Sequence, residues 1–135
     1  MKHLLMVTAW VEAATGLALV LSPSVPASIL LGASLDTPAE LVFARIAGGA
    51  LLSIGAACWL SRNDEKSHAA TGLVAALSLY DAAAIAILVH AGLGLGLSGI
   101  GLWPAVVLHL GLAGWCISCL LNRRVSRTSK QANQQ

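Results

Sequence analysis

Charged residues are scarce in this sequence. Lysine, arginine, aspartate and glutamate make up 10% of its 135 residues, while hydrophobic residues make up 57% and the mean hydropathy is +0.79. Soluble domains carry about a quarter charged residues, so this scarcity excludes an ordinary water-soluble domain and predicts a membrane protein. Cysteine is also rare, and all three cysteines fall inside apolar segments, so a disulfide framework of the secreted kind is not indicated. A chain of this length has room for one bundle and none for a separate catalytic domain of ordinary size.

Four long apolar runs are present instead, each close to the roughly 20 residues that a helix needs to cross a hydrocarbon core of about 30 Å. The second run has the clearest start, because "TPAE" places Thr37 at the N-cap, Pro38 at the first helical position and Glu40 three residues after the cap. The pattern predicts an all-α membrane protein, a four-transmembrane-helix bundle over residues 1–122. Its spans are expected at residues 4–21, 38–60, 69–91 and 102–121.

The connections between the runs carry signals of their own. The glycine-rich stretch "AGLGLGLSGIG" interrupts the helical pattern and predicts a flexible turn at the membrane surface. In the first connection, the apolar residues 29–31 are interpreted as a short helix lying along the interface. The first run follows "MKH" in the manner of a signal peptide, but Glu12 interrupts its apolar core, so it is interpreted as a span.

Lysine and arginine are distributed unevenly between the two ends of the expected bundle. The first and third connections hold none, whereas the N-terminus, the middle connection and residues 123–135 hold seven: Lys2, Arg62, Lys66, Arg123, Arg124, Arg127 and Lys130. The cytoplasmic side keeps such an excess, so both termini are predicted to be cytoplasmic in a multi-pass protein of the bacterial inner membrane. Residues 123–135 are interpreted as a flexible basic tail that faces anionic lipid, in preference to nucleic acid.

Three charged residues and one histidine lie deep inside the runs. At a rise of about 1.5 Å per residue, Glu12 lies about 12 Å from the cytoplasmic end of its span, Asp81 and His109 about 18 Å and Arg45 about 22 Å. A charge at mid-bilayer costs a few kcal/mol, so these side chains are expected to face the bundle interior and to pair. We predict that Arg45 pairs with Glu12 or Asp81 and that His109 joins by a hydrogen bond. Gly49, one turn after Arg45, begins a small-residue face that predicts close packing of helix backbones.

This intramembrane polar cluster, defined as Glu12, Arg45, Asp81 and His109, has three interpretations. It is a buried network that sets the register of the helices, a pathway for protons or solutes, or a set of partners for polar residues of another subunit. His109 by itself fits a hydrogen-bonded core histidine better than a metal or haem ligand. No metal site is therefore predicted, and the sequence assigns no cofactor.

The segment "CISC" places Cys116 and Cys119 three residues apart in the last run. A pair with this spacing in a four-span protein is similar to the quinone-linked thiol oxidoreductases of the vitamin K epoxide reductase type, and the resemblance implies a redox-active pair. The chain departs from that pattern because the charge distribution places both thiols near the cytoplasmic face, where thiols stay reduced. It also has no second cysteine pair in the outer connections.

The second run, "ARIAGGALLSIGAACWLSR", ends in a basic connection and belongs to a small four-span layout. This layout resembles the DoxX-like and related uncharacterised small membrane proteins of bacteria. The resemblance implies the fold and an inner-membrane location, and members of that group are described as oxidoreductase-associated subunits or as proteins of unknown function. No catalytic residue is carried over.

Three functions remain open at this point. The first is a non-catalytic integral protein that forms a homo-oligomer or serves as an accessory subunit of a membrane complex. The second is a small transporter, channel or proton-conducting protein that uses the intramembrane polar cluster. The third is a membrane thiol or quinone oxidoreductase that uses Cys116 and Cys119. The lack of a cofactor motif favours the first, and a catalytic role is not expected.

Overall fold

The computed structural model of the chain describes residues 1–64 and 67–132, and for residues 124–132 it describes the course of the helix alone. Within these residues the chain is all-helical, without strands. Four of its five helices are long and apolar enough to cross a membrane, as the sequence predicts. The helices are α1 (Lys2–Leu21), α2 (Ser24–Leu31), α3 (Pro38–Ser61), α4 (His68–Leu93) and α5 (Leu102–Ala132).

Side-chain caps mark the starts of α3 and α4. Thr37 accepts a hydrogen bond from the backbone N–H of Glu40, and the Glu40 carboxylate accepts one in return from the backbone N–H of Thr37, so the predicted capping box is confirmed. Ser67 caps α4 by accepting a hydrogen bond from the backbone N–H of Ala70 at 3.0 Å. Each cap satisfies donors that the first helical turn would otherwise leave unpaired.

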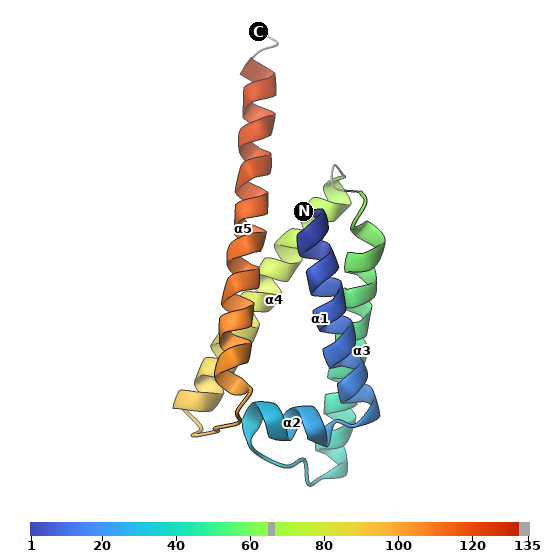
Figure 1. The fold of residues 1–135 in the computed structure, drawn as a ribbon, viewed down its shortest axis with the longest axis vertical. Helices are drawn as coiled ribbons and strands as arrows, with labels where there is room; N and C mark the ends of the chain where they lie inside the picture. The colour runs from blue at the N-terminus through green and yellow to red at the C-terminus, as the bar shows by residue number, and fades with distance from the viewer. Residues whose placement is uncertain (65–66, 133–135) are drawn as a thin grey trace.

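The four long helices form two antiparallel pairs, α1 with α3 and α4 with α5 (Figure 1). Glycine permits the close approach of α1 and α3, because a Cβ added at Gly16 would lie 2.7 Å from the carbonyl oxygen of Gly48. Gly55 has a similar place against the backbone of Ala9. Gly49, where the sequence predicts close packing of helix backbones, makes no such contact within the described chain, since no atom lies within 4 Å of a Cβ added there. The face that packs is offset by one residue.

Helix α2 crosses the end of the bundle opposite the N-terminus (Figure 1), where it contacts α1 and α5. The glycine-rich connection between α4 and α5 lies against it, and the N–H of Gly101 donates to the carbonyl oxygen of Ile29 at 2.8 Å. A Cβ added at Gly99 would lie 2.4 Å from that same oxygen. These glycines therefore permit backbone contact with α2, a role that the predicted flexible turn did not include.

Helix α5 continues to Ala132, well past the predicted end of the fourth span (Figure 1). The segment that the sequence interprets as a flexible basic tail from residue 123 follows a helical course as far as residue 132, while residues 133–135 lie outside the described residues. The stretch from 122 to 132 contains neither glycine nor proline and includes arginine, lysine and glutamine, which favour helix. The N-terminus, the α3–α4 connection and this end of α5 lie at one end of the molecule.

The buried core lies toward that end. It is built from apolar residues of four helices: Leu4, Leu5, Ala9, Cys58, Val74, Leu77, Leu112 and Cys116. The outer surface is also apolar, with large side chains such as Phe43, Leu60 and Leu79 more than 70% exposed. A soluble protein would cover so many exposed hydrophobic side chains, and this surface fits contact with lipid.

Candidate functional site

The buried carboxyl groups of Glu12 and Asp81 lie at the centre of the candidate site. Glu12 is 2% exposed and Asp81 3% exposed, although both are charged residue types that seldom bury without a partner. Glu12 shares the buried face of α1 with Thr8 and Gly16, one turn to either side, which is why it points inward. Asp81 shares a buried face of α4 with Leu77 in the same way.

Hydrogen bonds join these groups to side chains of other helices. Asp81 Oδ1 lies 2.8 Å from His109 Nδ1, and because a carboxylate accepts, the ring carries its hydrogen on Nδ1. The Tyr80 hydroxyl donates to Glu12 Oε2 across 3.4 Å. The rings of Tyr80 and His109 meet edge to face, with centroids 5.7 Å apart. Helices α1, α4 and α5 therefore bring Glu12, Asp81 and His109 together through Tyr80.

Tyr80 was not predicted as a site residue. It is the sole tyrosine of the chain and directly precedes Asp81. An amphipathic side chain with a hydroxyl at mid-span was the available signal, since a buried tyrosine hydroxyl usually has a partner. Ser78, which lies one turn from Asp81 in the sequence, instead donates to the carbonyl oxygen of Val74 within its own helix.

Arg45 does not join this group, so the predicted pairing with Glu12 or Asp81 is wrong. Its side chain is exposed, and its Nε donates to the carbonyl oxygen of Val20 at 3.3 Å. Val20 lies in the last turn of α1, where carbonyl groups lack helical partners and the helix dipole is negative. Arg45 thus meets the C-terminal end of α1, about 12 Å along that helix from Glu12 at 1.5 Å per residue.

A cavity of ≈530 Å³ lies between the two helix pairs, and every helix contributes to its wall. Glu12, Tyr80 and His109 line it, whereas the rest of the wall is apolar apart from Thr15. Leu30 of α2 also lines it, and α2 lies at the end of the bundle opposite the N-terminus (Figure 1). The other lining residues are Val11, Leu19, Ala47, Leu51, Ala83, Ala84, Ile87, Leu88, Ala105 and Leu108.

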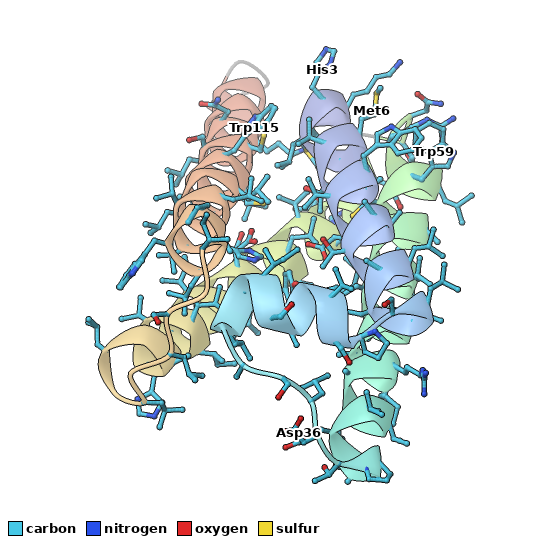
Figure 2. All side chains as sticks on the ribbon, turned by 60° about the horizontal axis from the view of Figure 1, so that its bottom comes forward. His3, Met6, Asp36, Trp59 and Trp115 are labelled. Atoms are coloured by element: carbon cyan, nitrogen blue, oxygen red, sulfur yellow. The ribbon has the colours of Figure 1, made fainter. Side chains whose placement is uncertain are left out.

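A second hollow, of ≈310 Å³, lies on the outside of the α1–α3 pair. Trp10 and Trp59 flank it with their rings edge to face at 6.1 Å, and the Arg62 guanidinium lies 3.9 Å from the centre of the Trp59 ring. Figure 2 shows Trp59 at the same end of the molecule as His3. The lining of this hollow is almost wholly apolar and includes no charged side chain.

The three cysteines are free thiols, and they lie toward the core end rather than in the cavity. Cys116 is 1% exposed and packs in the same cluster as Cys58, while Cys119 is half-buried beside it. A thiol that exchanges disulfides must meet its partner, and the burial of Cys116 gives the predicted redox pair little access. Within the described residues, no three histidine, cysteine or acidic side chains gather as metal ligands.

Comparison with known proteins finds no match. No protein-family model, characterised protein or solved structure is similar enough to this chain to assign it a family. The chemistry of the cavity and of its polar wall is therefore what bears on function.

Proposed function

We propose that this chain is a four-span protein of the bacterial inner membrane that binds a small lipid-soluble molecule in the cavity between its two helix pairs. The cavity carries the proposal. A concave, mostly apolar space lined by a few polar groups is the usual form of a small-molecule site. The apolar wall would accept the body of the ligand, and Glu12, Tyr80 and His109 would orient its polar end.

The proposed binding role is non-catalytic, as the sequence favours, and it assigns Glu12, Asp81 and His109 of the intramembrane polar cluster to the binding site. Asp81 contributes indirectly, because its carboxylate holds the His109 ring through Nδ1 and leaves Nε2 for a ligand. A solute or proton pathway would use the same residues, but it requires a route from the cavity to both membrane surfaces. Apart from Glu12, Thr15, Tyr80 and His109 the wall of the cavity is apolar, which favours binding over conduction.

A cavity-filling variant tests the binding role. Ala84 lines the cavity, so Ala84→Phe should abolish the rise in melting temperature that lipid-soluble compounds cause in purified protein in a non-ionic detergent. The matched control is Ala86→Phe on the same helix, an exposed position outside the lining. Equal responses of the two variants to a panel of neutral, cationic and anionic compounds would contradict a site in this cavity.

The proposed orientation places both termini in the cytoplasm, as the uneven distribution of lysine and arginine favours. A reporter fused after Gln135 and another inserted at Asp64 should both give cytoplasmic signals, and one inserted at Gly96 an external signal. An external signal from the Gln135 fusion would overturn this orientation without affecting the cavity.

A homo-oligomer or an accessory-subunit role is a second candidate, supported by one face of α5. Gly111 and Gly114 are exposed with no atom within 4 Å of an added Cβ, and Ser118 donates back to the Gly114 carbonyl oxygen. Small residues at this spacing let another helix approach closely in lipid. Gly114→Leu should then reduce the particle size in detergent, while Gly72→Leu, at an open position on α4, should not.

A further inference from the structure

Glu12 and His109 line the cavity and Asp81 contacts His109, so the acidic groups in this site outnumber the basic one. Glu12 and Asp81 supply two carboxyl groups, and His109 supplies one imidazole, which already contacts Asp81 at 2.8 Å. Within the described residues, Glu12 has no lysine or arginine partner. The arginine expected to fill that role, Arg45, contacts the carbonyl oxygen of Val20 instead.

Glu12 therefore lies in an apolar environment with weak compensation. Its partner within the described chain is the Tyr80 hydroxyl at 3.4 Å, which is beyond the usual distance for a strong O–H···O bond. Burying a carboxylate is unfavourable unless a positive group accompanies it, so this position requires either a proton or a cation. Because Glu12 lines the cavity, a cation bound there can reach it.

The wall of the cavity distinguishes between kinds of cation. Small inorganic cations such as Ca²⁺ and Mg²⁺ take six or more oxygen ligands, and most of this wall is aliphatic. An organic cation needs few oxygen ligands, since its charge is spread over a body that apolar side chains can cover. The Tyr80 ring beside Glu12 adds an aromatic group of the kind that attracts such cations.

We propose that the cavity ligand is a small lipophilic organic cation, an amine or onium ion, with its charge beside the Glu12 carboxylate. This inference rests on the proposed function, because it names the ligand class of the same cavity. Tyr80 and His109 flank the charged end, while the substituents lie against Leu51, Ile87 and Leu108. The bound cation takes the place of the proton or arginine that Glu12 otherwise requires.

Two probes of the same shape and opposite charge test this assignment without any mutation. Tetraphenylphosphonium should raise the melting temperature of the purified protein in a non-ionic detergent and bind saturably in equilibrium dialysis, whereas tetraphenylborate should do neither. Glu12→Gln should weaken tetraphenylphosphonium binding by about tenfold or more, because it removes the charge and keeps the shape. Asp36→Asn removes an exposed carboxylate at the end of the molecule opposite His3 (Figure 2) and should leave tetraphenylphosphonium binding unchanged.

The outcomes separate this inference from the proposed function. Equal binding of the two probes, each abolished by Ala84→Phe, would overturn the cation assignment and leave a cavity that binds apolar molecules. Binding of neutral compounds alone would also overturn the cation assignment and leave a cavity that binds apolar molecules. If no compound of any charge responds to Ala84→Phe, the proposed function fails together with the inference. Should Glu12→Gln fail to fold, the comparison of the two probes on the unaltered protein still decides.

Discussion

The contact between α1 and α3 predicts different effects of alanine at two neighbouring glycines, Gly48 and Gly49. An alanine Cβ at Gly48 would lie 2.7 Å from the carbonyl oxygen of Gly16 and 2.9 Å from the Cβ of Leu19. Backbone must move to relieve the first of these contacts, and overpacking of this kind costs about 1–3 kcal/mol. At Gly49 the same substitution meets no atom within 4 Å. Both variants gain the same helix propensity, up to about 1 kcal/mol, so that gain cancels in the comparison.

Gly48→Ala should therefore be less stable than Gly49→Ala by about 1–3 kcal/mol. For a chain of this size, about 3–5 °C of melting temperature corresponds to each kcal/mol. Circular dichroism melting curves in one non-ionic detergent would measure the difference. Equal melting temperatures, or a lower value for Gly49→Ala, would refute the helix contact described here and favour the small-residue face that begins at Gly49.

Three further predictions concern polar contacts. Asp81→Ala and His109→Ala should each destabilise the protein by about 1.5–3 kcal/mol, and the double variant should lose less than the sum; additive losses would show that the 2.8 Å contact contributes nothing. The losses of stability in Arg45→Leu and Glu12→Leu should be additive in the same melting assay, because the two side chains belong to separate contacts. Partial recovery of stability in the double variant would instead show that Arg45 and Glu12 form an ion pair. Thr37→Ala should cost about 1 kcal/mol through loss of the α3 cap, and an unchanged melting temperature would show that water replaces it.

The long helices could be predicted because each apolar run is long enough to span a membrane. The inward positions of Glu12, Asp81 and His109 also followed from the sequence, since polar groups inside such runs avoid lipid. Arg45 also finds a polar partner, but not a carboxylate. A carbonyl group in the last turn of a neighbouring helix satisfies it, and the sequence does not reveal which helix end lies beside which side chain.

The cavity could not be predicted in this way. Its volume depends on the crossing of the two helix pairs, and that crossing depends on contacts such as those of Gly16 and Gly48, whose register the periodicity does not specify. Tyr80 was missed for a related reason, because its hydroxyl reaches Glu12 only in the assembled bundle. Sequence periodicity places residues on a helix face, but distances between faces come from packing.

The division of the bundle into two pairs has a mechanical consequence. Residues 1–64 hold α1 to α3, residues 67–132 hold α4 and α5, and most helix contacts lie within one half. Glu12 belongs to the first half, whereas Tyr80 and His109 belong to the second. The two halves meet in the shared buried core, in the long Tyr80–Glu12 bond and in the contacts of α2, so a movement of one half against the other would break these contacts and leave every helix intact. A ligand in the cavity would contact residues of both halves at once, so its binding would hold the two halves together.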